Sequence, residues 1–175
     1  LALRSLVNLE ELVLPNGEGI RHTATLIVQQ CFYFPNLRKL VFSQYLSAEG
    51  LLEIAKIAAA GGLQKLEFLC LSVNHTITEE TWRNFFQTLS NMPDLQNMDF
   101  SRLVTHQIKC QAATVKSFIQ CVSRLPSLRT INMIGWLFDE KDLNMFEIMK
   151  KQHPQSKDLS LTWKFILPSV PIINE

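Results

Sequence analysis

The chain has 175 residues, of which 17 are Lys or Arg and 16 are Asp or Glu, so its formal net charge is +1 at pH 7. A chain this close to neutral has no single-sign field to attract nucleic acid or a membrane surface, and we expect neither partner. Hydrophobic residues make up 47% of the chain, which excludes disorder and predicts a single domain over residues 1–175 with a substantial core. It contains no apolar run of about 18 residues or more, and Leu1–Leu14 lack the features of a signal peptide, so we expect a cytoplasmic protein.

Apolar residues recur along the whole chain at steps of three, three and two. The first copy consists of Leu6, Leu9, Leu12 and Leu14. Five further copies begin at Phe34, Leu63, Met92, Leu125 and His153, so successive copies start 28, 29, 29, 33 and 28 residues apart. The sixth copy is degenerate, because only its last two members are apolar. A period near the long end of about 20–29 residues, with this spacing, is typical of leucine-rich repeats that contain one strand and one helix.

The spacing changes from strict alternation to a helical period within each copy, which predicts one strand and one helix per repeat. In chain order, the strands are expected near residues 10–14, 38–42, 67–71, 96–100, 129–133 and 158–162. The helices are expected near residues 18–32, 48–60, 79–91, 110–124 and 140–151. Ser47, Thr78 and Asp139 precede three of these helices, where their side-chain oxygens can accept from the free N–H groups of the first turn.

These elements predict an α/β fold, namely a ribonuclease-inhibitor-like leucine-rich repeat solenoid of about six strand–helix repeats. The repeats are expected near residues 6–33, 34–62, 63–91, 92–124 and 125–152, with a C-terminal cap at 153–175. One repeat cannot bury its apolar face alone, so the strands should stack into a parallel sheet on the concave face. Because Leu1–Leu9 begin part-way through a repeat, we expect further chain to precede them in a larger protein.

The concave face of this sheet is the first candidate protein-binding surface. Lys39, Phe68 and Asp99 occupy outward positions on three neighbouring strands. Phe68 has no other aromatic residue beside it at the outward positions, so the set forms no aromatic hot-spot cluster. The sequence therefore predicts a contact surface of mixed polarity.

The longest spacing inserts extra chain at Ser101–Gln111, and insertions in solenoids often form loops that contact a partner. Arg102, His106 and Lys109 make this insertion mildly basic. They are the second set of candidate protein-binding residues. A longer solvated loop without a partner is the simpler alternative.

Long leucine-rich repeats commonly place Asn or Cys three residues after the last leucine, where the side chain satisfies backbone groups of the turn. These positions hold Gly17, Tyr45, Asn74, Leu103 and Trp136. Only Asn74 fits, so the turns are expected to be irregular. The string Asn74-His75-Thr76 also matches the N-glycosylation pattern, but we favour Asn74 as a turn residue.

The sequence contains no convincing catalytic or metal-binding constellation, so we expect no enzyme and no cofactor in this chain. The cysteines Cys31, Cys70, Cys110 and Cys121 form no C-x-x-C pair that would bind zinc, and a chain of this size needs no disulfides. Cys110 and His106 lie four residues apart, yet no third group accompanies them to orient a nucleophile. No phosphate-binding G-x-x-x-x-G-K-[ST] string occurs.

Several strings in the chain resemble the C-terminal leucine-rich region of the NLR innate-immune receptors, specifically the NAIP group that carries IAP repeats. These strings are Asn8–Pro15, Glu53–Lys56, Ile77–Glu80, Arg83–Gln87, Asn91–Pro93, His153–Lys157, Ile166–Pro168 and Pro171–Ile173. They span nearly the whole chain. The resemblance is therefore more specific than the generic repeat.

The resemblance implies a large cytosolic sensor in which zinc-binding IAP repeats and an ATP-binding NACHT region precede this solenoid. Such proteins recognise bacterial flagellin or type III secretion components, recruit a CARD-containing NLR co-receptor into an inflammasome and activate caspase-1. They are also described as apoptosis inhibitors. The family's zinc, nucleotide and caspase motifs are absent here, so no site residue carries over. The repeats would hold the receptor inactive by covering its own NACHT region, and they would contribute to ligand engagement.

The residues alone leave a second class of function open. A ligand-capturing adaptor, similar to ribonuclease inhibitor or to a ubiquitin-ligase substrate receptor, would hold a protein target on the same concave face.

Overall fold

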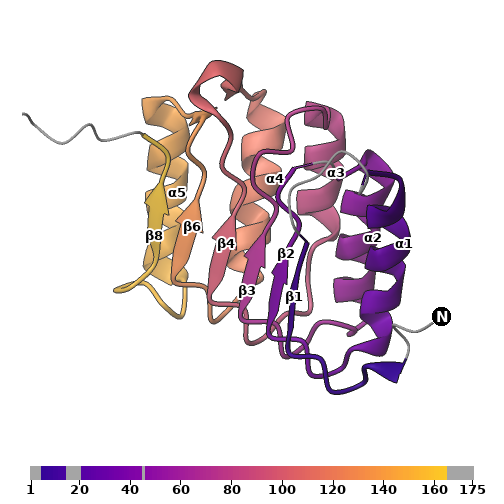
Figure 1. Cartoon of the computed structure of the whole chain (residues 1–175). Helices are drawn as coiled ribbons and strands as arrows, with labels where there is room; N and C mark the ends of the chain where they lie inside the picture. The colour runs from indigo at the N-terminus through magenta and orange to yellow at the C-terminus, as the bar shows by residue number, and fades with distance from the viewer. Residues whose placement is uncertain (1–4, 15–20, 45, 165–175) are drawn as a thin grey trace, which may run out of the picture.

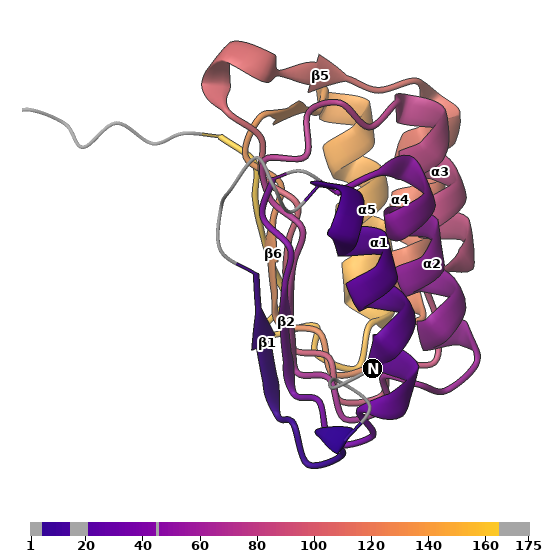
Figure 2. The same cartoon turned by 45° about the vertical axis from the view of Figure 1, so that its right-hand side comes forward.

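The structure is a computed structural model that describes residues 5–14, 21–44 and 46–164. Its main element is a parallel sheet whose strands follow one another in chain order, and five helices cover one face of that sheet (Figures 1 and 2). The strands are β1 (Glu11–Val13), β2 (Lys39–Val41), β3 (Phe68–Cys70), β4 (Asn97–Asp99), β6 (Thr130–Asn132) and β8 (Ser160–Thr162). The helices are α1 (Arg21–Gln30), α2 (Ala48–Ala59), α3 (Glu79–Thr88), α4 (Ala112–Ser123) and α5 (Glu140–Gln152). Each strand and helix lies within one or a few residues of its predicted range, and the α/β class is confirmed.

The central residues of the strands form one row across the sheet. This row consists of Leu12, Leu40, Leu69, Met98, Ile131 and Leu161, each paired with the next. The four inner members are buried, whereas Leu12 and Leu161 on the edge strands are only partly buried. Because side chains alternate along a strand, burying this row places its neighbours on the face without helices.

The three predicted helix caps are present. Ser47 Oγ accepts from Gly50 N at 3.0 Å, and Thr78 Oγ1 accepts from Thr81 N at 3.3 Å. Asp139 and Asp142 cap α5 reciprocally, because each side chain accepts a hydrogen bond from the other's backbone N–H. Each bond satisfies a donor that the first helical turn leaves free.

Aromatic side chains fill the middle of the core between the sheet and the helices. Trp82, Phe85 and Phe86 of α3 are buried. Trp82 meets Trp136 edge to face, with ring centroids 5.4 Å apart, and Phe85 meets Phe100 edge to face at 5.6 Å. Such pairs stabilise the fold beyond the apolar area that they bury.

Three of the turns after the strands share one backbone conformation. Gln44, Val73 and Gly135 stand at equivalent positions and have φ values of 65°, 61° and 86°. A β-branched residue such as Val73 adopts positive φ only when its surroundings enforce it. The buried side chain of Asn74 does so in this turn, because its Nδ2 donates to Phe42 O and Leu71 O and its Oδ1 accepts from Leu46 N.

The turns are more regular than the residue pattern predicts. Trp136 occupies the position equivalent to Asn74, and its Nε1 donates to Phe100 O at 2.7 Å. Phe100 lies in the repeat before Trp136 at the position that Phe42 holds in the repeat before Asn74. An indole therefore makes the hydrogen bond that the sequence pattern assigns to an asparagine.

The insertion at Ser101–Gln111 contains structure that the sequence analysis did not predict. A 3-10 turn, η4 (Val104–His106), leads into β5 (Ile108–Lys109), which pairs in parallel with β7 (Trp136–Leu137). This two-stranded sheet lies beyond one end of the main sheet (Figure 2). Arg102 N also donates to Ile134 O at 2.7 Å, so both ends of the insertion are fixed to the next turn.

The first member of the repeat pattern is exposed in the first copy and buried in the sixth. Leu6, the first apolar member of the first copy, is 46% exposed. At the other end, His153 fills the position of a leucine and is buried, with Nε2 2.9 Å from Leu125 O. Predictions for Pro15, Gly17 and Tyr45, and for the cap and family strings at 165–175, lie outside the described residues. None of the described helices is both long and apolar enough to cross a membrane.

Phe85→Ala is expected to lower the free energy of unfolding by about 3–5 kcal/mol, because it removes a fully buried ring from the aromatic cluster. Urea unfolding followed by circular dichroism measures this change. Phe32→Ala is the matched control, since Phe32 in η3 (Cys31–Tyr33) is 52% exposed and its loss should change stability by only about 0.5 kcal/mol. Equal effects of the two substitutions would contradict the assigned core.

Candidate functional site

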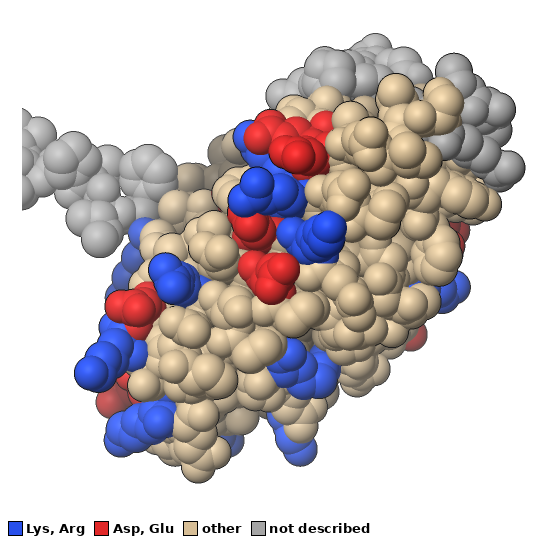
Figure 3. Space-filling model, turned by 90° about the horizontal axis from the view of Figure 1, so that it is seen from below, with Lys and Arg blue, Asp and Glu red and all other residues tan. Residues whose placement is uncertain are grey.

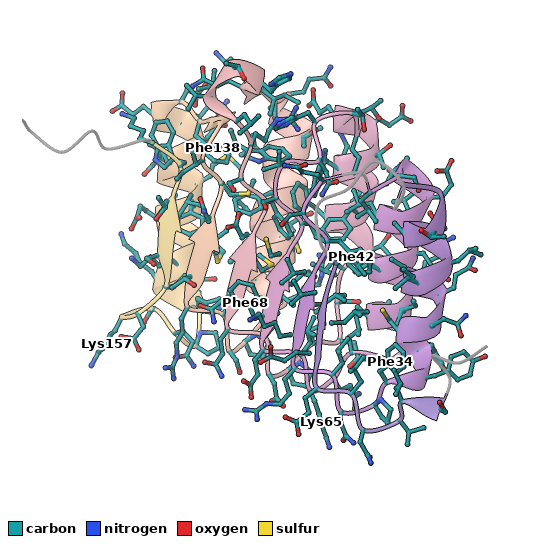
Figure 4. All side chains as sticks on the ribbon, in the orientation of Figure 1. Phe34, Phe42, Lys65, Phe68, Phe138 and Lys157 are labelled. Atoms are coloured by element: carbon teal, nitrogen blue, oxygen red, sulfur yellow. The ribbon has the colours of Figure 1, made fainter. Side chains whose placement is uncertain are left out.

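The open face of the sheet brings two predicted binding residues together at β2 and β3. Lys39 and Phe68 are paired in register, and Lys39 Nζ lies 6.0 Å from the centroid of the Phe68 ring. The same ammonium group is 3.6 Å from Glu11 Oε2 on β1. Both residues are half-buried, and Phe68 stands on the uncovered side of β3 (Figure 4). This arrangement presents an aromatic surface beside a partly neutralised cation.

Asp99 is held more tightly than a free surface carboxylate. Its Oδ1 accepts from Ser101 N at 2.9 Å, and its Oδ2 accepts from Asn132 Nδ2 at 3.1 Å. On the neighbouring row, Thr130 Oγ1 donates to Asn97 Oδ1. A shallow depression of about 250 Å³ lies over these side chains and is bordered by Phe68. Asp99 therefore has both a structural and a surface role.

A row of alternating charges lines the edge of the sheet where the strands begin. Arg38 donates to Glu67 through Nη2 at 2.9 Å and 3.1 Å and through Nε at 3.2 Å. Glu67 raises the pKa of the exposed Arg38 guanidinium above its ordinary value. Seen from below, positive and negative side chains stand next to each other here (Figure 3). Together with Glu10 and Gln96, they border a depression of about 390 Å³.

Sequence reasoning missed this charged row, although a signal for it was present. Arg38 and Glu67 each stand immediately before a strand, at equivalent positions in successive repeats. Opposite charges at equivalent positions of adjacent parallel strands face each other. Both side chains are substantially exposed, so the ion pair contributes little to stability and mainly defines the surface.

The structure separates the three predicted residues of the insertion. Arg102 is buried, its Nε donates to His106 O at 2.8 Å, and its guanidinium lies 5.8 Å from the Trp136 ring. His106 and Lys109 are exposed. Arg102 therefore holds the insertion together from inside, and it does not offer its charge to a partner as the sequence analysis expected.

Three of the thiols are poorly suited to nucleophilic chemistry. Burial raises the pKa of Cys110 to about 12, and it raises the pKa values of Cys31 and Cys121 to about 12 as well. His106 Nδ1 is 2.9 Å from the Thr105 hydroxyl, so this nitrogen is engaged away from Cys110. Within residues 5–14, 21–44 and 46–164, no three His, Cys, Asp or Glu side chains gather as metal ligands.

Asn74 is also inaccessible as a sugar acceptor. The residue is 3% exposed, and its side chain makes four hydrogen bonds to backbone groups of two successive turns. This burial supports the turn role over the glycosylation match.

Comparison with known proteins assigns the chain to a family. No protein-family model matches it. It is 55% identical over 173 residues to "Baculoviral IAP repeat-containing protein 1" of Homo sapiens and 52% identical over 174 residues to "Baculoviral IAP repeat-containing protein 1a" of Mus musculus. Both matches cover 99% of this chain, which spans 12% of the length of each relative.

Two weaker likenesses accompany these matches. "NLR family CARD domain-containing protein 4" of Mus musculus is 26% identical over 78% of the chain and 13% of its own length. A solved protein from Bacteroides fragilis has a TM-score of 0.46 and 17% identity over 77% of this chain and 38% of its own. Because the two stronger matches each cover 99% of it at more than 50% identity, the chain belongs to the family of baculoviral IAP repeat-containing protein 1.

Proposed function

We propose that the chain is a ribonuclease-inhibitor-like leucine-rich repeat solenoid with its parallel sheet on the concave face. Three observations support this assignment. The strands follow chain order, each paired residue recurs after about one repeat length, and the helices all lie on the same side. The hydrogen bonds of Asn74 and Trp136 repeat the same turn on two units.

We infer that this solenoid is the protein-interaction and autoregulatory module of a cytosolic NLR sensor. The observation that carries the proposal is the similarity of 99% of this chain to baculoviral IAP repeat-containing protein 1, combined with a sheet face that no described helix covers. In the whole receptor, zinc and ATP would bind outside this chain. The ligand would be bacterial flagellin or a type III secretion component, and a CARD-containing NLR co-receptor would complete the inflammasome and activate caspase-1. A role in inhibiting apoptosis belongs to the same proposal.

The mechanism follows from tethering. A solenoid joined to its own NACHT region binds it at a high effective concentration, so even a weak contact keeps the receptor closed. A ligand that binds better to the open receptor shifts the equilibrium by its difference in affinity for the two states. The mixed charges at the sheet edge and the Lys39–Phe68 pair are suited to such a weak contact.

Deleting the segment that corresponds to this chain from the full-length receptor is expected to raise caspase-1 activation in the absence of microbial ligand. The reason is that the deletion removes the solenoid that contacts the NACHT region and keeps the receptor closed. The measurement is caspase-1 cleavage in cells that express matched amounts of each form, with full-length receptor carrying Phe32→Ala as the control. Unchanged basal cleavage after the deletion would contradict autoregulation.

A ligand-capturing adaptor is the second candidate function, and the depression beside Phe68 and Asp99 favours it. Lys39→Glu combined with Asp99→Asn should then abolish target capture while leaving thermal unfolding nearly unchanged. Asparagine is chosen because it keeps an acceptor for Ser101 N. Lys56→Glu with Lys116→Glu, two exposed positions on the helices, is the matched control for pull-down assays. Capture that survives the first pair of changes would exclude this face.

We also propose that the chain is not an enzyme and needs no cofactor of its own. With a pKa of about 12, about one Cys110 thiol in 100,000 is ionised at pH 7, and the thiolate is the reactive form. Brief treatment with iodoacetamide at neutral pH should therefore leave Cys110 unlabelled in mass spectrometry, with the unfolded chain in urea as the labelled control. Rapid, selective labelling of Cys110 in the folded chain would reopen the enzyme hypothesis.

A further inference from the structure

Two histidines from neighbouring turns stack on each other beside the buried Arg102. His75 follows Asn74 in the turn after β3, and His106 ends η4 in the insertion. Their ring centroids are 4.3 Å apart and their planes differ by 4°. This stack joins two loops that are otherwise separated by a whole strand–helix unit.

The stack has no hydrogen-bonding partner that would stabilise a charge on His75. Both ring nitrogens of His75 are shielded from solvent and unpaired, as is Arg102 Nη1. The pKa of His75 is lowered, because burial disfavours the charged ring and because His106 and Arg102 add positive charge nearby. Arg102 is charged at every physiological pH, so its repulsion of an imidazolium is permanent.

Carboxylates near the two loops do not relieve this repulsion. Glu79, at the start of α3, accepts from Gln111 N and Thr114 Oγ1, both at 2.7 Å, and lies 3.7 Å from Arg83. Glu80, in the same turn, is exposed. Among the described residues, neither carboxylate bonds to either imidazole. Lys109 adds a further positive charge on the insertion, and the Cys110 thiol is neutral because its pKa is about 12.

We propose that His75 and His106 form a proton-sensitive latch that closes the insertion Leu103–Lys109 onto the turn Val73–Thr78. Two neutral rings attract each other in a parallel stack. Two protonated rings beside Arg102 repel each other, and separating them lets both become hydrated. Protons therefore bind more tightly to the open form than to the closed one.

The direction of the pH dependence follows from the lowered pKa. The ordinary pKa of a histidine is 6.5, and that of His75 is lower in the closed state. Its contribution to the stability of the closed state is therefore complete above pH 6.5 and is lost as the pH falls below that value. For each pKa unit by which the closed state lowers the pKa of His75, complete protonation raises the equilibrium constant for opening about tenfold.

Opening changes the surface that the insertion presents. His106 O is the acceptor of Arg102 Nε, and the Arg102 guanidinium covers the Trp136 ring. Releasing His106 would therefore expose a cation and an aromatic ring on a surface that is closed at neutral pH. The proposal thus makes acidification a regulator of the candidate binding residues on this insertion.

Hydrogen exchange of the 175-residue chain at pH 7.5 and pH 5.0, corrected for intrinsic exchange rates, tests the latch. Protection of the amides at 103–109 should fall at pH 5.0, while protection in α2 should stay constant. The carbon-bound ring protons of His75 should titrate below pH 6.5, because its pKa is lowered. His75→Phe keeps a flat ring without a charge, and it should abolish the acid-dependent loss of protection.

The proposal is overturned if the insertion keeps its protection at pH 5.0, or if the loss persists unchanged in His75→Phe. Should the first substitution prevent folding, His106→Phe at the exposed position gives the same test.

Discussion

The row of apolar side chains that crosses the sheet from Leu40 to Ile131 is the interaction on which the rest of the structure depends. Each three-residue strand is too short to be stable alone, and each helix buries only one side. Their stability comes from the neighbours that continue the row in both directions. The uncovered face, the charged edge and the insertion keep their positions because this buried row fixes the register of every strand.

Polar contacts on the open face both connect the repeats and shape the surface. Asp99 accepts from its own turn and from Asn132 on the next strand, and Lys39 bridges Glu11 and Phe68. A partner that docks here would meet side chains whose conformations are already restricted. Such restriction lowers the entropic cost of binding, which makes a face without an aromatic cluster more effective than its composition indicates.

The sequence predicted the strands and helices well because their signal is local. Steps of three, three and two place the buried side chains directly, and Ser47, Thr78 and Asp139 mark helix starts by their chemistry. The β5–β7 sheet could not be predicted in this way, since two-residue strands have no period. The burial of Arg102, the stacking of His75 on His106 and the use of Trp136 in place of asparagine all depend on contacts between distant repeats. From the sequence, Arg102 was a candidate protein-binding residue of a mildly basic insertion, with a solvated loop as the alternative.

The hydrogen bonds of Asn74 and Trp136 also restrict which insertions and deletions such a chain tolerates. Each side chain satisfies a buried carbonyl that belongs to the preceding unit, at Phe42 and at Phe100. A duplication or excision that begins at a helix end would keep both bonds only if it removes or adds one complete period. An insertion or deletion of any other length would leave a buried carbonyl without a hydrogen-bond donor, which costs about 1–3 kcal/mol. Length variation among relatives should therefore concentrate within loops such as the insertion before α4, or occur in whole units.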